Sequence, residues 1–222
     1  MHGCSGIYSY SDPSRGIALL YTEWAARLND AGYAALLVDS FSPRNVGQNQ
    51  CSNGDNGVSE ANDRPRDAYA AQKYLSKQRT VDASRIVLLG WSHGAGATLA
   101  TLSDTMVKPG EKPYKAGYAF YPGCGLYNAF GGISTSTYRP YVPLTILHGS
   151  ADPLYQSGYC QQRIDNALNF GARDFSMTVF SGAQHSFDMA RSAVSPWTMY
   201  DINAKTSADA QVMQSLLQTF GN

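Results

Sequence analysis

Residues 85–100 read RIVLLGWSHGAGATLA, and three kinds of pattern follow one another within them. Residues 86–89 are an unbroken apolar run typical of a buried strand, GWSHG occupies 90–94, and small residues at helical spacing complete the stretch. A G-x-S-x-G pattern between a strand and a helix is the context of a nucleophile elbow, in which glycines leave room for a sharp turn. We therefore predict a strained backbone at Ser92 and a hydroxyl exposed at the carboxyl end of a sheet. The alternative is a chance Gly-Ser turn, which the flanking strand and helix disfavour.

The composition limits the class of protein. A length of 222 residues with 43% hydrophobic content suits one domain, 1–222, with a sizeable core. The 17 basic and 17 acidic residues cancel, so there is no electrostatic case for a nucleic acid partner or an anionic membrane. No apolar run approaches the ~20 residues that a membrane-spanning helix needs.

The chain has four cysteines: Cys4, Cys51, Cys124 and Cys160. None has the C-x-x-C spacing of a zinc or thioredoxin-like site, so neither is expected. Three disulfide pairings are possible, and the alternative is four reduced cysteines acting as small hydrophobic residues. Because Cys51 lies in the polar stretch 40–59, we favour bridges, which imply an oxidising, extracytoplasmic compartment.

Strand and helix patterns alternate along the rest of the chain. Buried strands are predicted at 33–39, 86–90, 116–121, 144–148 and 175–180. Helices are predicted around 17–28, over 60–78, after residue 92, around 160–168 and up to residue 220, the last capped by Thr206 or Ser207. This alternation predicts an α/β fold with a mostly parallel, doubly wound sheet and helices on both faces.

Two further polar residues follow predicted strands. Asp152 comes in the turn after 144–148, and His185 comes in the loop after 175–180. A serine hydroxyl is a weak nucleophile that needs a base and an orienting carboxylate, and such groups gather beyond the carboxyl ends of parallel strands. Because the nucleophile-elbow architecture uses the order serine, acid, histidine, we predict Ser92 as nucleophile, Asp152 as acid and His185 as base.

An oxyanion hole needs two backbone N–H groups, and the sequence offers a candidate for each. The residue after the nucleophile, His93, supplies one, and its ring is expected to point away from Ser92. The second is expected from Cys4, in the His2-Gly3-Cys4 loop, for which an ordinary glycine turn is the alternative. We interpret His148, near a strand end, as a hydrogen-bonded and partly buried residue.

Six stretches together resemble the dienelactone hydrolase family of α/β-hydrolases and are spread over most of the chain. They are HGCSG at 2–6, GYAALLVDSFSPR at 32–44, GWSHG at 90–94, FYPGCG at 120–125, LHGSADP at 147–153 and His185. The resemblance implies the α/β-hydrolase fold and a carboxylic ester or lactone hydrolase that acts through an acyl-enzyme. It implies a small-molecule substrate and no metal or cofactor, with Ser92, Asp152 and His185 in the roles given above.

The chain departs from the family at its nucleophile. Dienelactone hydrolases proper use cysteine, and a thiolate is far more nucleophilic at neutral pH than the hydroxyl of Ser92. This difference favours a general serine esterase within the family. An amidase or acyltransferase using the same triad, and a catalytically inactive binding form or fragment of the fold, remain open alternatives.

A second departure lies at the front of the chain. In this fold the strand before the H-G loop lies between the strands predicted here at 33–39 and 86–90, and two further strands usually precede it. Nothing precedes Met1 in this sequence. We therefore expect the first strands to be missing and the chain to be an N-terminally shortened form of a longer protein.

The topology that the resemblance implies also suggests disulfide pairings and a substrate pocket. It makes the elements bearing Cys124 and Cys160 neighbours, which leaves Cys4 to pair with Cys51. Segments 122–143 and 186–205 are expected to wall the pocket. The candidate lining residues are aromatic: Tyr127, Phe130, Phe187 and Trp197.

Overall fold

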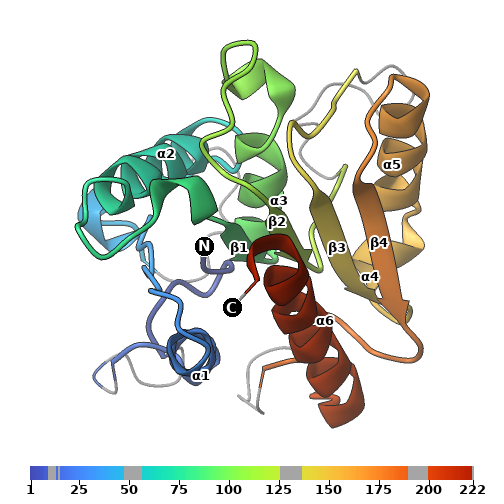
Figure 1. Cartoon of the computed structure of the whole chain (residues 1–222). Coiled ribbons are helices and arrows are strands. Elements are labelled where there is room, and N and C mark those ends of the chain that lie inside the picture. The colour runs from blue at the N-terminus through green and yellow to red at the C-terminus, as the bar shows by residue number, and fades with distance from the viewer. Residues whose placement is uncertain (10–13, 15, 48–56, 126–136, 190–199, 222) are drawn as a thin grey trace.

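The computed structural model describes residues 1–9, 14, 16–47, 57–125, 137–189 and 200–221. Its centre is a sheet of four parallel strands in the order β1-β2-β3-β4 (Figure 1). The strands are β1 (Leu88–Trp91), β2 (Gly117–Phe120), β3 (Leu144–Gly149) and β4 (Phe175–Phe180). In the register of the sheet, neighbouring positions on the four strands are Gly90, Ala119, Ile146 and Met177.

Helices cover both faces of the sheet, as predicted (Figure 1). One face packs against α2 (Asp63–Leu75), α3 (His93–Thr101) and α5 (Tyr159–Asn169), and the other against α1 (Leu19–Asp30) and α6 (Ile202–Phe220). The remaining helical turns are short: η2 (Ser42–Arg44), η5 (Ala83–Arg85), η6 (Asp104–Met106) and α4 (Pro153–Gln156). Successive residues of a strand point to opposite faces. Ala119 therefore packs in the core under α2, α3 and α5, and its neighbours Tyr118 and Phe120 pack in the core under α1 and α6.

The strand predicted at 33–39 is the one element that the structure contradicts. The other four predicted strands are present within about two residues of their expected bounds. Residues 33–39 form no strand, and the backbone of 34–38 makes no hydrogen bond to a described residue. An apolar run becomes a strand only when a neighbour pairs with it, and none of the described strands lies beside this one.

The last helix begins earlier than predicted. The sequence suggested Thr206 or Ser207 as the N-cap, whereas α6 starts at Ile202 with Asp201 as its cap. The Asp201 carboxylate accepts hydrogen bonds from two backbone N–H groups of the first turn, at 2.9 and 3.0 Å. Two otherwise unpaired donors are satisfied there, which is why the helix extends back to this residue.

A disulfide joins Cys124 to Cys160, as predicted, and ties the segment after β2 to α5. No described cysteine is free. Cys51 lies outside the described residues, so the Cys4–Cys51 pairing stays a prediction. Among the residues that the structure describes, no helix combines the length and the apolar character needed to cross a bilayer.

Candidate active site

Ser92 occupies a sharp turn between β1 and α3. Its backbone angles are φ 51° and ψ −116°, a region that residues with side chains rarely adopt, and this bears out the predicted strain. The glycines on either side are required by space. A Cβ on Gly94 would collide with the carbonyl oxygens of Met1 and His2, and a Cβ on Gly90 would collide with the carbonyl of Gly94.

The structure brings the three predicted residues Ser92, His185 and Asp152 together in a hydrogen-bonded row. Ser92 Oγ lies 3.0 Å from His185 Nε2, and His185 Nδ1 lies 2.7 Å from Asp152 Oδ2. Asp152 is completely buried, and its Oδ1 accepts a 2.8 Å hydrogen bond from the N–H of Leu154. Because an ionised carboxylate only accepts hydrogen bonds, the His185 proton is on Nδ1, and Nε2 presents a lone pair to the Ser92 hydroxyl.

Close packing between two loops holds Asp152 and His185 together. Asp152 follows β3 as the N-cap of α4, and His185 follows β4. The N–H of Ala151 donates to the carbonyl of Ala183 at 2.9 Å. Gly149 at the end of β3 allows this approach, because a Cβ there would collide with the backbone of Ala183. The ends of adjacent parallel strands thus set the distance between acid and base.

His148 is a second histidine beside the same carboxylate. It is fully buried, and its Nε2 donates to the carbonyl of Pro122 at 3.2 Å. Burial lowers the pKa of His148 to about 4, against the smaller raising effect of Asp152. Neutral His148 therefore turns an unprotonated Nδ1 towards Asp152 Oδ2, at 3.3 Å. His148 is hydrogen-bonded as expected, but buried more completely than the sequence suggested.

His93 places its ring and its backbone in different surroundings. Arg64 Nη1 donates to His93 Nδ1 at 2.7 Å, and the ring also packs edge-on against Phe41. Burial lowers the pKa of His93 to about 3, so the ring is neutral. Its backbone N–H is at the start of α3, donates to no described residue, and belongs to the electropositive end of the helix. The ring contacts fit the expectation that it points away from Ser92.

The H-G loop lies directly against the elbow. A Cβ on Gly3 would be 3.5 Å from that of Ser92, and the Gly3 N–H donates to the Tyr21 hydroxyl at 2.9 Å. The His2 ring fixes the loop further, because Nδ1 donates to the Gly3 carbonyl at 2.8 Å and Nε2 accepts from the Ser40 N–H at 3.1 Å. Cys4 follows at once in the chain, and its N–H stays the predicted second oxyanion donor.

A buried carboxylate, Asp188, supports this site and was not among the residues predicted from the sequence. It accepts hydrogen bonds from the Tyr121 hydroxyl at 2.6 Å and from Trp91 Nε1 at 3.0 Å, and burial raises its pKa to about 6. The Tyr121 ring packs edge-on against the His185 ring, with centroids 4.8 Å apart. The one available signal was Trp91 within the elbow, since a buried indole N–H needs an acceptor.

Glu60 and Arg64 are two buried charged residues close to α3. Glu60 lies against Gly96, where a Cβ would come within 2.7 Å of its carboxylate. Burial raises the pKa of Glu60 to about 8 and lowers that of Arg64 to about 10. Both contact the His93 ring, since Arg64 Nη1 donates to Nδ1 at 2.7 Å and Glu60 Oε1 lies 3.9 Å from Nε2.

The predicted pocket residues are only partly tested. Phe187 is fully buried, with its ring 5.6 Å from that of Tyr121 and 5.2 Å from that of Phe180, so it belongs to the core and not to an open wall. Tyr127, Phe130 and Trp197 lie outside the described residues. Within the described ranges, no three His, Cys, Asp or Glu side chains are grouped so as to hold a metal ion.

Comparison with known proteins gives a family and a fold. A sequence model of the dienelactone hydrolase family matches residues 15–222. A promiscuous, dienelactone hydrolase-like phosphotriesterase from metagenomic libraries is 23% identical with a TM-score of 0.71, over 99% of this chain and 84% of that one. A Pyrococcus furiosus esterase is 18% identical with a TM-score of 0.66, over 100% of this chain and 82% of that one. No curated protein sequence matches.

Proposed function

The chain belongs to the dienelactone hydrolase family, and from this we propose that it is a serine hydrolase that cleaves carboxylic esters or lactones through an acyl-enzyme. The observation that supports the proposal is the row from Ser92 Oγ through His185 to Asp152, at 3.0 and 2.7 Å. Both distances allow proton transfer, and the imidazole carries its proton on the side away from the nucleophile.

In the proposed reaction, Ser92 Oγ attacks the ester carbonyl while its proton moves to His185 Nε2. The carbonyl oxygen becomes an oxyanion that accepts hydrogen bonds from the N–H groups of His93 and Cys4. His185 then gives the proton to the leaving alcohol, which departs and leaves an ester on Ser92. Water, deprotonated by the same imidazole, releases the acid. Asp152 stays ionised throughout and stabilises the transient imidazolium.

The serine nucleophile makes the base essential. A hydroxyl has no appreciable ionised fraction at neutral pH, so Ser92 depends on His185 for every attack. Tyr121 helps to position this base. Its ring packs against the His185 imidazole, and its hydroxyl donates to buried Asp188. Amide cleavage or acyl transfer by the same residues, and an inactive binding form, stay as alternatives.

The decisive experiment is hydrolysis of short-chain p-nitrophenyl esters by the chain and by Ser92→Ala. We expect hydrolysis with a burst of p-nitrophenol under acyl-enzyme accumulation, and loss of both in the variant. Ser176→Ala, a change at an exposed strand residue, is the matched control and should keep full activity. Hydrolysis that survives Ser92→Ala would remove the nucleophile assignment, and no turnover of any ester by the folded protein would remove the function.

The disulfide supports a proposal on compartment. Cys124–Cys160 is the kind of bridge that persists in oxidising surroundings, so we place the protein outside the cytoplasm. Mass spectrometry after thiol alkylation of protein from its native source tests this. Alkylation of both cysteines without prior reduction would contradict it.

A further inference from the structure

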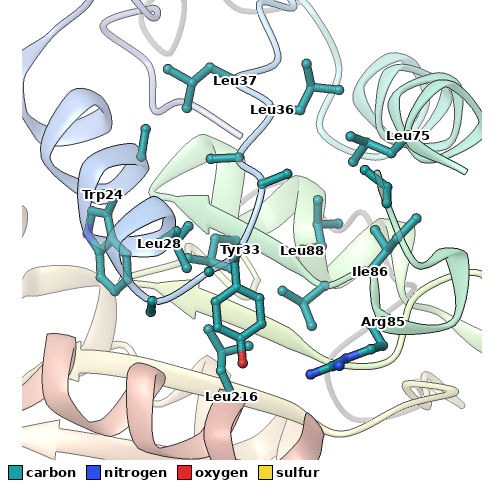
Figure 2. Close-up of a pocket in the computed structure, with 18 of the residues that line it drawn as sticks. Trp24, Leu28, Tyr33, Leu36, Leu37, Leu75, Arg85, Ile86, Leu88 and Leu216 are labelled. Atoms are coloured by element: carbon teal, nitrogen blue, oxygen red, sulfur yellow. The ribbon is translucent and has the colours of Figure 1, made fainter. Parts of the chain in front are cut away.

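The apolar and the charged surroundings of the elbow come from different parts of the chain. A groove of about 440 Å³ runs beside β1, and its walls in Figure 2 are almost entirely apolar. Charged side chains reach the elbow from α2, which packs against α3, and from residue 60 just before it. Arg64, in the first turn of α2, is completely buried, and the proposed reaction gives it no role.

Arg64 holds the first residue of α3 by its side chain. Arg64 Nη1 donates to His93 Nδ1 at 2.7 Å, and the Arg64 backbone is itself fixed, because its N–H donates to the Ser59 carbonyl at 3.1 Å. Residues 94–96 read Gly-Ala-Gly, so in this turn of the helix only the His93 side chain extends beyond Cβ. The first turn of α3 can therefore be gripped by a side chain of its own only through the His93 ring.

The turn before His93 needs such a grip. Ser92 has φ 51° and ψ −116°, and a strained backbone persists only where its surroundings fix it. The N–H of His93 follows this residue directly, and it is the first of the two donors assigned to the oxyanion. A misplacement of about 1 Å at a reacting centre can cost ~100-fold in rate. Fixing the His93 ring therefore fixes an oxyanion donor.

The same guanidinium also supports the loop that carries the second donor. Its carbon lies over the Phe41 ring, 5.5 Å from the centroid. Phe41 is buried and packs edge-on against the rings of His93 and His2, with centroids 6.0 and 4.4 Å apart. His2 fixes the H-G loop, to which Cys4 belongs. One cation thus contacts His93 directly and the H-G loop through Phe41 and His2.

The buried charge of Arg64 is costly for a purely structural role. Burial lowers its pKa only to about 10, so it stays a cation, while burial raises the pKa of Glu60 to about 8, so this neighbour is mostly protonated at neutral pH. Arg64 Nε and Nη2 are buried and have no hydrogen-bond partner among the described residues. A buried charge without a partner destabilises a fold, but positive potential is useful where an oxyanion forms.

The potential of Arg64 reaches both loops that carry the predicted donors. Burial first, and Arg64 second, lower the pKa of His2 to about 2 and that of His93 to about 3. Both rings are therefore neutral at neutral pH, and Arg64 is the cation that acts on both. A negative charge that develops between these loops is stabilised by the same potential.

We propose that Arg64 is the positioning residue of the oxyanion hole, which holds the rings of His93 and Phe41 and so directs the N–H groups of His93 and Cys4 at the oxyanion. The inference rests on the proposed function, because it assigns a role within that reaction. The oxyanion exists in the transition state and not in the bound ester. Loss of Arg64 should therefore lower kcat and leave KM nearly unchanged.

Kinetics of p-nitrophenyl ester hydrolysis test the proposal. Arg64→Met keeps the apolar stem and removes the charge and the donors, whereas Arg64→Lys keeps the charge and a donor. Arg66→Met, at an exposed residue of α2, is the matched control. We expect Arg64→Met to lower kcat at least ~10-fold with KM within ~3-fold, Arg64→Lys to lose less, and the control to match the parent. Equal kcat in Arg64→Met and the control, or a loss confined to KM, overturns the proposal.

A double-mutant cycle tests whether Arg64 acts through His93. His93→Leu keeps the backbone N–H and removes the ring nitrogen that accepts from Arg64. We expect His93→Leu to lower kcat at least ~10-fold by itself, and the two substitutions together to cost little more than either one. Two losses that multiply contradict the proposal. Should Arg64→Met not fold, His93→Leu and Arg64→Lys decide the matter, and parental kcat in both would refute it.

Binding of an alkyl trifluoromethyl ketone reports on the oxyanion hole itself. Ser92 Oγ forms a bond to the ketone carbon, the π electrons of the carbonyl move to its oxygen, and the Ser92 proton passes to His185, so the adduct carries the oxyanion. We expect its inhibition constant to rise at least ~10-fold in Arg64→Met, and that of the methyl ketone of equal chain length, which forms little adduct, to stay within ~3-fold. Unchanged inhibition by the trifluoromethyl ketone counts against the proposal.

Failure of this inference and failure of the proposed function give different results. A folded parent that hydrolyses no ester and is not inhibited by the trifluoromethyl ketone removes the function and this inference with it. An active parent whose Arg64→Met form keeps the parental kcat and inhibition constant removes the inference alone.

Discussion

Replacing Asp152 by asparagine keeps the shape of a fully buried side chain and changes its hydrogen-bonding capacity. The oxygen that accepts from Leu154 N–H at 2.8 Å has to remain an oxygen, so the new NH₂ takes the place of Oδ2. There it faces His185 Nδ1 at 2.7 Å and His148 Nδ1 at 3.3 Å. An NH₂ group donates only, so His185 moves its proton to Nε2 and can no longer accept the proton of Ser92.

The size of the loss in kcat follows from the free-energy cost of turning the new amide the other way round. Turning the amide round restores the reactive tautomer, but it sets the NH₂ against the Leu154 N–H and leaves two buried donors without acceptors. At about 1–3 kcal/mol for each, the reactive arrangement lies about 2–6 kcal/mol higher, which corresponds to a loss of roughly 30- to 20,000-fold in kcat. The equivalent change in serine proteases costs ~10⁴ in kcat.

The same geometry predicts that the variant stays folded. In the unreactive orientation, the NH₂ donates to the His185 and His148 nitrogens that accept beside it, so no buried group loses a partner. We therefore expect Asp152→Asn to lose ester hydrolysis with a thermal midpoint close to that of the parent.

The assay is p-nitrophenyl ester hydrolysis together with ¹⁵N NMR of labelled histidine, which reports which nitrogen of His185 carries the proton. Asp104→Asn, at a half-buried carboxylate paired with exposed Arg139, is the matched control and should keep full activity. A kcat within tenfold of the parent, or a proton still on Nδ1 in the variant, would refute the reasoning.

Three further changes test other contacts. Gly94→Ala forces a Cβ against two carbonyl oxygens of the H-G loop, so we expect about 1–3 kcal/mol of destabilisation by denaturant unfolding and at least ~10-fold slower ester hydrolysis. Cys124→Ser with Cys160→Ser opens a link of sequence separation 36 and should lower the unfolding free energy by about 4 kcal/mol, with little change in kcat. Burial raises the pKa of Glu60 from its ordinary value of 4.5 to about 8 in the folded protein, so Glu60 binds a proton more tightly when folded. Its contribution to the free energy of unfolding is complete below pH 4.5 and is lost as the pH rises to 8. Glu60→Gln should remove this loss of stability, measured by urea unfolding over the same pH range.

Features that depend on local sequence could be predicted. The run 86–89 followed by GWSHG marks a strand, a tight turn and a helix, because neighbouring residues alone determine those conformations. The positions of Asp152 and His185 could be predicted as well, since both follow buried strands and the carboxyl ends of parallel strands meet at one edge. Their 2.7 Å contact could not, because it depends on packing between two loops.

Features that depend on distant partners were missed or wrong. Residues 33–39 have the apolar composition of a strand but lack the neighbour that would pair with them. Asp188 follows His185 by three residues, yet no spacing rule connects it with Trp91 and Tyr121, the donors that it accepts from. In each case the deciding contact joins residues that are far apart in the chain.

The proposed triad lies at the carboxyl ends of the strands, whereas the free edge of the sheet runs along β1. Ser92, Asp152 and His185 follow β1, β3 and β4, whose ladder through β2 is continuous, so their geometry does not depend on what lies beyond the free edge of β1. The H-G loop does depend on it, because that loop continues from Met1, whose position is set by two hydrogen bonds to the same edge.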